Sequence, residues 1–118
     1  MLTTGIVAAA CAIALQVEGA HATQKGDGGH AVGIGQMHIE AVKEVNRILG
    51  YEAFTLADRE NPAKVRDMMA ITLSWHHLRH PERSAVWLAS KWHSPFRAAP
   101  AWHMRKLQKA AVIAKGAV

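Results

Sequence analysis

A glycine-rich segment, residues 26–36, most restricts how this chain can fold. It reads Gly-Asp-Gly-Gly-His-Ala-Val-Gly-Ile-Gly-Gln. Glycine takes up positive φ at little steric cost, so this density of glycines favours tight turns. The segments on either side carry apolar residues at helical spacing. The sequence therefore predicts a mainly helical α+β domain with a small β-hairpin near residues 26–36.

Start and stop signals divide the rest of the chain into helices. Glycines close the first two, while Asn61 and Pro62 are a good cap and first turn for a central helix. Prolines delimit the later ones, with Pro81 predicted to begin a short helix. The expected helices cover residues 5–18, 37–49, 62 onward, 81–92 and 101–115. The inward face of the central helix is expected to carry Val65, Met68, Met69, Thr72, Leu73 and His76.

Length and composition indicate one globular domain spanning residues 1–118. A chain of this size can bury a single core, and half of its residues are hydrophobic. The single cysteine, Cys11, excludes an intramolecular disulfide and lies in an apolar stretch, where it is expected to be a small core residue.

The formal charge of +5 is unevenly distributed along the chain. From Arg79 onward there are eight Lys and Arg against one acid, whereas the first 78 residues carry six against eight. A basic half of this kind favours an anionic polymer as partner. Peptidoglycan with its wall acids, nucleic acid and an acidic membrane surface all remain open on charge alone.

Residues 1–22 imitate a secretory signal peptide, with an apolar core and a small-residue ending at Ala20-His21-Ala22. The basic start typical of such signals is missing, and cleavage would also remove Glu18. We therefore expect this stretch to be the first folded helix and not a signal peptide. Its many alanines and threonines make it too weakly hydrophobic for membrane insertion.

Glu18 closes this otherwise uncharged apolar stretch. Apolar neighbours and the partial negative charge at a helix C-terminus both disfavour an ionised carboxylate, so both raise its pKa. A carboxylic acid that stays protonated near neutral pH can act as a general acid. The alternative is a solvated glutamate at a helix end.

The order of several short motifs resembles the lysozyme-like superfamily over nearly the whole chain. After Glu18 come the glycine-rich segment with Gly35-Gln36-Met37-His38, then Asn46-Arg47, then Asp58-Arg59-Glu60-Asn61-Pro62. In particular the chain is similar to the small lytic transglycosylase or muramidase domains of bacteriophage particles and bacterial wall enzymes. The resemblance implies a lysozyme-like helical domain that binds and cleaves peptidoglycan.

The resemblance also implies roles for individual residues. Glu18 matches the catalytic glutamate that protonates the glycosidic oxygen between N-acetylmuramic acid and N-acetylglucosamine. Gln36 matches the glutamine that lines the cleft, and the glycines before it would let the backbone approach the sugar. The late helix ending at Trp92 and His93 matches a segment that contacts substrate, and Trp102 is a further candidate for stacking on a sugar ring. The expected substrate-binding residues are Gly33, Gly35, Gln36, Trp92, His93 and Trp102.

Two positions depart from the family pattern. Gly19 follows the glutamate where a serine is common, and His93 stands where an asparagine is usual. Both change the hydrogen bonding around the acid. They leave open a catalytically inactive lysozyme-like subunit that serves a structural role in a phage particle or other assembly.

A second carboxylate would decide between hydrolysis and transglycosylation. Asp27 is the nearby candidate, although an aspartate between glycines is typical of a residue that stabilises a turn. Without a partner, one glutamate can act first as acid and then as base. The lytic transglycosylase route with Glu18 alone is therefore the preferred mechanism, with hydrolysis as the alternative.

Other clusters give weaker signals. His76 and His80 are four residues apart, which could hold zinc on a helix, but packing and capping explain them better, and neither a metal nor a cofactor is expected. The basic run Arg105-Lys106-Leu107-Gln108-Lys109 lacks any accompanying nucleic-acid motif. We expect the chain to act on the cell wall or in the periplasm, carried as part of a larger assembly such as a phage virion or tail.

Overall fold

The structure, a computed structural model, describes residues 4–116. Residues 1–3, which begin the stretch that imitates a signal peptide, lie outside the described residues, as do residues 117–118. The described chain forms five α-helices and a two-stranded antiparallel sheet, so the predicted mainly helical α+β class is confirmed. The helices are α1 (Gly5–Glu18), α2 (Ile39–Leu49), α3 (Pro62–Arg79), α4 (Ala85–His93) and α5 (Ala101–Gly116).

Capping residues set the ends of α1 and α3. The Thr4 side chain accepts a hydrogen bond from the Val7 amide, and Gly19 ends α1 in the left-handed region at φ 54°. Asn61 caps α3 by accepting from two amides, with Pro62 in the first turn. All six residues expected on the inward face of α3 are buried.

The glycine-rich segment forms a smaller β element than a regular hairpin. Strands β1 (Lys25–Gly26) and β2 (Ala31–Val32) pair antiparallel, with Gly26 opposite Ala31. A short 3-10 turn, η1 (Asp27–Gly29), joins them, and Val32 forms a further bridge with Met37. The predicted hairpin is therefore present, although most of the segment consists of turns.

The fourth helix begins later than the sequence predicted. Pro81 lies in a turn closed by the Arg83 amide donating to the His80 carbonyl, and α4 starts only at Ala85. Ser84 supplies the start signal, because its side chain accepts from the Trp87 amide at 3.1 Å. A serine hydroxyl satisfies an orphan amide of the first turn, which proline cannot do.

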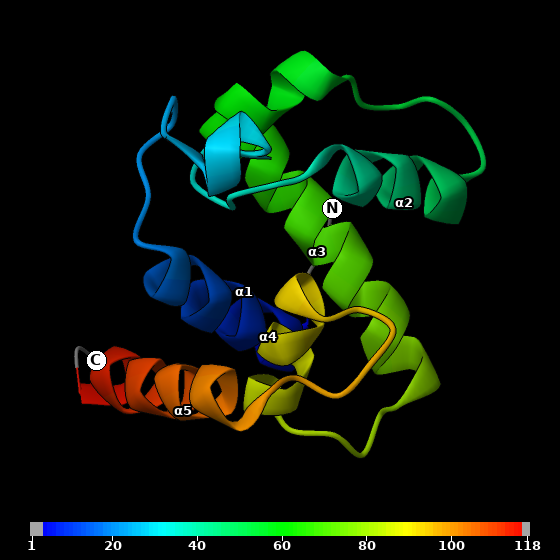
Figure 1. The fold of residues 1–118 in the computed structure, drawn as a ribbon. Coiled ribbons are helices and arrows are strands. Elements are labelled where there is room, and N and C mark those ends of the chain that lie inside the picture. Colours follow the sequence, from blue (N-terminus) through cyan, green and yellow to red (C-terminus); the bar gives the residue numbers. More distant parts are fainter. Residues whose placement is uncertain (1–3, 117–118) are drawn as a thin grey trace.

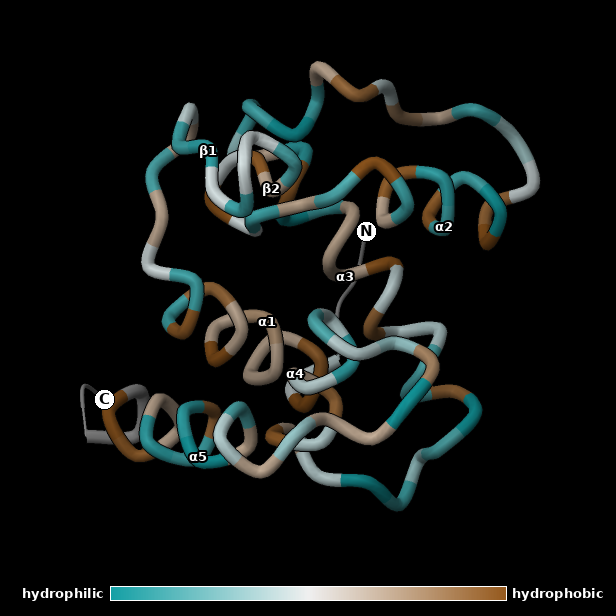
Figure 2. Tube along the Cα trace, viewed as in Figure 1, coloured by the Kyte–Doolittle hydropathy of each residue, from teal (hydrophilic) through white to brown (hydrophobic). Residues whose placement is uncertain are grey.

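The core has two parts that meet around α3 (Figure 1). Helices α1 and α4 pack on one side of α3, with α5 packed against α1 and α4, while α2 and the 3-10 turn η2 (Leu56–Glu60) pack on the other side. Figure 2 shows the resulting difference in pattern: α1 is apolar along most of its length, whereas α2 alternates between polar and apolar residues. Trp92 packs against both parts of the core. Nowhere between residues 4 and 116 does a helix combine the length and hydropathy needed to span a membrane.

Candidate active site

A cleft of about 900 Å³ opens between α2 and the segment formed by α4 and the loop after it. Glu18 from the end of α1 and Asp27 from the glycine-rich segment lie on its wall. Residues from α2, including Glu44 and Arg47, form the opposite side, and Thr72 of α3 also contributes. The cleft thus joins elements from both parts of the core.

Glu18 occupies the last turn of α1, is partly buried and faces the cleft. Burial raises the pKa of its carboxyl group to about 7, although the positive charge of Lys106 works in the opposite direction. The pKa is therefore raised, as the sequence predicted, and burial is the main cause. A substantial fraction of Glu18 carries its proton at neutral pH, which suits a general acid.

Asp27 lies on the cleft wall but in a different environment. Its side chain is 70% exposed and pairs with His38, whose Nε2 is 3.3 Å from the carboxylate. The backbone of Asp27 is in the left-handed region at φ 51°, and its carbonyl accepts from the His30 amide. The turn expected here is present, and the side chain faces solvent and His38.

Gln36 lines the cleft, and its side-chain amide also holds the glycine-rich segment together. Its Nε2 donates to the carbonyls of Gly33 at 3.0 Å and Gln24 at 3.3 Å. The side-chain oxygen occupies the space where a Cβ on Gly26 would lie. Both side-chain amide hydrogens of Gln36 are therefore bound to backbone carbonyls, and the side-chain oxygen is the group left to accept a hydrogen bond from a ligand.

Trp92 and Gly35 both line the cleft and bind each other. The indole Nε1 of Trp92 donates to the Gly35 carbonyl at 2.8 Å, which ties α4 to the glycine-rich segment. A Cβ added to Gly35 would lie 2.8 Å from a methyl of Val65 and 3.1 Å from the Trp92 ring. This glycine therefore permits close packing of α3 and α4 against the turn, in addition to any approach of a ligand.

Gly33 has a different surrounding from the one expected. It is not among the residues that line the cleft, and a Cβ on it would overlap the carbonyl oxygen of Arg59. Its φ is 81°, so a side chain would also be strained there. The absence of a side chain at Gly33 serves the packing of η2 and not an approach of the backbone to the cleft.

His93 lies on the cleft wall at the end of α4. Its Nδ1 is 2.9 Å from the Ser94 hydroxyl, and its ring stacks on the buried His103 at a centroid distance of 4.2 Å. Partial burial and the positive charges of Arg97 and His38 lower its pKa, which favours the neutral ring. Trp102 meets the His93 ring edge-on at 5.9 Å but does not line the cleft.

Several residues that line the cleft were not predicted from the sequence. Phe96 is 75% exposed on the rim, and Lys91, Arg97, Glu44 and Arg47 also line the cleft. A signal for Phe96 existed, because an aromatic residue after Pro95 in a polar loop is a candidate for stacking on a ligand. The charged residues come from two distant elements, so no local pattern joins them.

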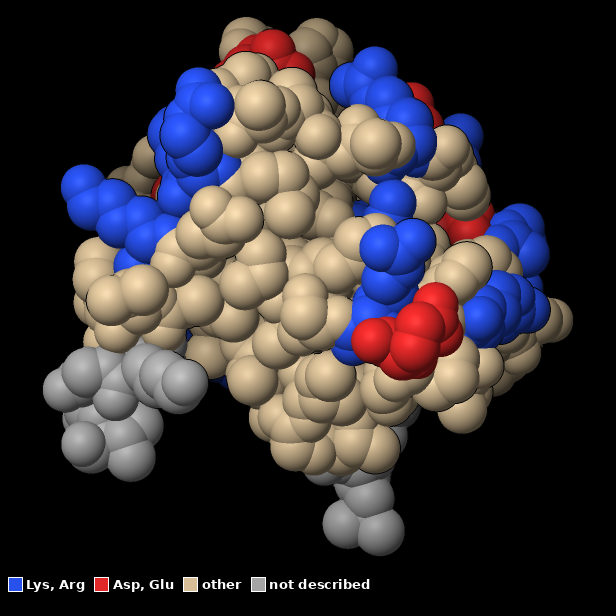
Figure 3. Space-filling model, turned by 90° about the horizontal axis from the view of Figure 1, so that it is seen from below, with Lys and Arg blue, Asp and Glu red and all other residues tan. Residues whose placement is uncertain are grey.

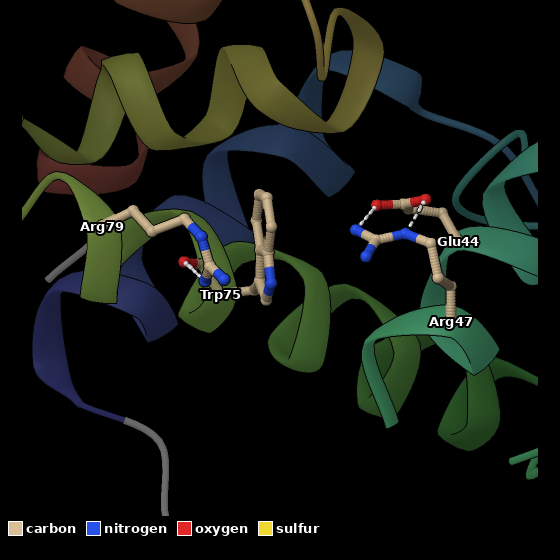
Figure 4. Close-up of polar contacts among 4 residues, drawn as sticks. All are labelled: Glu44, Arg47, Trp75 and Arg79. Carbon is tan, nitrogen blue, oxygen red and sulfur yellow. Dashed lines mark hydrogen bonds and ion pairs between the residues drawn. The ribbon is translucent and has the colours of Figure 1, made fainter. Parts of the chain in front are cut away.

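Figure 4 shows the surroundings of Arg47, which lies between Glu44 of α2 and Trp75 of α3. Arg47 forms a bidentate ion pair with Glu44 on α2, and its guanidinium lies 5.5 Å from the Trp75 ring centroid. Arg79 covers the same ring at 3.7 Å and donates to the Trp75 carbonyl. Since Glu44 neutralises Arg47, this pair adds little net charge to the cleft.

The two histidines considered for zinc pack against aromatic rings. His76 is buried between Trp75 and Trp87, and His80 meets Trp87 at a centroid distance of 5.1 Å. Burial, together with the nearby positive charge of Lys91, lowers the pKa of His76 to about 4. Within residues 4–116, no group of three His, Cys, Asp or Glu side chains is arranged to hold a metal.

Basic side chains of the C-terminal half are dispersed over the surface. On the face drawn in Figure 3, Lys and Arg form several separate groups, with uncharged surface or acidic side chains between them. Arg105, Lys106 and Lys109 are exposed along α5. These charges could attract an anionic polymer over a broad area, whereas a continuous basic groove for nucleic acid is not visible on this face.

Comparisons with known proteins give no match, whether with family models, with curated proteins or with solved structures.

Proposed function

We propose that this protein is a lysozyme-like enzyme that cleaves the glycan strands of peptidoglycan between N-acetylmuramic acid and N-acetylglucosamine. The observation that carries the proposal is a partly buried glutamate with a pKa of about 7 on the wall of a cleft of about 900 Å³. A cleft of this size can enclose several atoms on each side of a glycosidic bond. The exposed ring of Phe96 on the rim offers an apolar platform for a sugar.

The proposed reaction uses Glu18 twice. In its acid form Glu18 donates a proton to the glycosidic oxygen, and the bond from that oxygen to C1 of muramic acid breaks. The resulting carboxylate takes the proton from the muramic acid C6 hydroxyl while O6 attacks C1. The products are a 1,6-anhydro ring and a new hydroxyl on the glucosamine, Glu18 is protonated again, and no water is consumed.

The environments of the two carboxyl groups favour this route over hydrolysis. Glu18 is partly buried and has a raised pKa, whereas Asp27 is well exposed and paired with His38. A nucleophilic or water-activating carboxylate would work best against bound substrate, shielded from solvent. Hydrolysis assisted by Asp27 is the alternative mechanism.

Release of soluble muropeptides from purified cell walls tests the proposal. The wild-type chain should release them, and Glu18→Gln should reduce the rate at least about 100-fold because glutamine cannot donate the proton. Glu52→Gln removes an exposed carboxylate outside the cleft and should leave the rate unchanged. Equal release by wild type and Glu18→Gln would refute the proposal. A folded wild-type protein that releases nothing would favour an inactive structural subunit instead.

A further inference from the structure

Three cations on the cleft wall have no counter-ion among the described residues, namely Lys43 on α2 and the neighbouring pair Lys91 and Arg97. Lys91 belongs to the last turn of α4, and Arg97 belongs to the loop that follows. Among the described residues, no carboxylate forms an ion pair with either side chain. They differ in this respect from Arg47, which Glu44 neutralises on the opposite wall.

Lys91 is unusual because it is only 9% exposed. Its ammonium group donates to the Arg97 carbonyl at 3.1 Å and lies 4.8 Å from the Trp87 ring centroid. An ammonium group has three donors, and the structure gives this one a single hydrogen-bond acceptor. Burying a cation without an anion is costly, and burial together with the charge of Arg83 lowers the pKa of Lys91.

The charge that lowers the pKa of Glu18 is that of Lys106 on α5. Lys91 and Arg97 are coupled to each other through the hydrogen bond to the Arg97 carbonyl. The end of α4 and the loop after it therefore place two unneutralised cations in the same cleft as Glu18.

We propose that Lys91 and Arg97 bind a carboxylate of the substrate while Glu18 acts on the glycosidic bond. This inference rests on the proposed function, since it takes the cleft as the glycan-binding site. In peptidoglycan the carboxylate belongs to the substituent on O3 of muramic acid. It is the lactyl carboxylate where no peptide is attached, and a carboxylate of the peptide where the lactyl carboxyl is bound in an amide. Charge-assisted hydrogen bonds from an ammonium and a guanidinium group suit such a ligand, and glucosamine units lack one.

Binding in a Glu18→Gln background tests this inference, because the ligand then stays uncleaved. Titration calorimetry would use three probes: glucosaminyl-muramyl-tetrapeptide, the same disaccharide with a free lactyl carboxylate, and N-acetylglucosamine disaccharide. Lys91→Met should weaken binding of a carboxylate-bearing probe at least about tenfold. The carboxylate-free sugar should bind this variant as well as it binds the parent.

The first two probes distinguish the source of the carboxylate. If only the tetrapeptide probe loses affinity, the peptide supplies the carboxylate. If only the probe with the free lactyl carboxylate loses affinity, the lactyl group supplies it, and if both lose affinity, the site accepts either group. Arg97→Gln provides a second variant at an exposed position, in case Lys91→Met does not fold, and should act in the same direction. The matched controls are Lys109→Met and Arg105→Gln, which remove the same charges from exposed positions on α5 and should change nothing.

The outcomes separate this inference from the proposed function. Unchanged affinity of both cation variants for all three probes would overturn the carboxylate site, even if the wild-type enzyme cleaves cell walls. Failure of every probe to bind would overturn it as well. Selective loss of affinity for carboxylate-bearing probes would support the site, even if the wild-type chain released no muropeptides.

Discussion

Trp92 on α4 donates its indole hydrogen to the carbonyl of Gly35, 57 residues earlier in the chain. The bond joins the two walls that carry Gln36 and His93, and the Trp92 ring packs against both parts of the core. The shape of the cleft therefore depends on a side chain that the sequence suggested as a sugar contact.

Trp92→Phe should keep most of the packing and lose this hydrogen bond. The Gly35 carbonyl would then lack its partner at a partly buried position, so we expect the free energy of unfolding to fall by about 1–2 kcal/mol. Chemical denaturation measures the change. Trp102→Phe is the control, because Trp102 is half exposed and its ring donates no hydrogen bond to any described residue; its effect should stay below about 0.5 kcal/mol. Equal effects of the two substitutions would contradict the assigned role of Trp92.

Gly33→Ala should be among the most damaging small substitutions in the chain. The new methyl would overlap the Arg59 carbonyl and sit at φ 81°, so we expect a loss of about 3 kcal/mol or more. Gly50→Ala has nearly the same φ, 84°, with open space around it, and should cost only about 1 kcal/mol. Thermal and chemical unfolding of both variants measure the difference, which isolates the overlap with Arg59. If Gly33→Ala lowers the free energy of unfolding no more than Gly50→Ala does, the close packing of the Arg59 carbonyl against Gly33 is contradicted.

The raised pKa of Glu18 makes stability depend on pH in a defined direction. Between the ordinary pKa of 4.5 and the folded value of about 7, the folded chain keeps a proton that the unfolded chain has lost. Stability therefore falls as pH rises through this window, and the contribution becomes constant above it. Relative to Glu18→Gln, the wild type should lose about 2 kcal/mol between pH 4.5 and 7.5. The comparison with this variant cancels the titration of the histidines. A stability difference that does not change with pH would contradict the burial of the acid.

Asp27→Asn tests whether a second carboxylate takes part in the reaction. If Glu18 acts alone, cell-wall cleavage should fall no more than about threefold, which reflects only the lost ion pair with His38. A loss of 100-fold or more, with folding intact by circular dichroism, would assign Asp27 a catalytic role and favour hydrolysis.

Local signals predicted the helices well because capping and apolar periodicity act over a few residues. Gly19 and Gly50 end helices in the left-handed conformation that glycine adopts easily, and the Asn61 side chain caps the start of α3. The predicted start of the fourth helix at Pro81 was wrong, because proline is found both in the first turn of a helix and in loops. The helix begins after Ser84, whose side chain caps its first turn.

The candidate site could be predicted only in part, because many of its contacts join residues that are distant in the sequence. Glu18 carries its own signal, since a lone acid at the end of an apolar helix is expected to be desolvated wherever that helix packs. The roles of Gly33, Lys91 and Arg97 depend on which distant groups the fold places beside them. Arg59 lies 26 residues from Gly33, and the acids that could have neutralised Lys91 lie elsewhere in the fold.

Mass spectrometry of the products released from purified cell walls tests the central claim most directly. The account predicts muropeptides that end in 1,6-anhydromuramic acid from the wild-type chain and none from Glu18→Gln. Products with reducing ends would contradict the single-glutamate route, and anhydro products from Glu18→Gln would contradict the role of Glu18 itself.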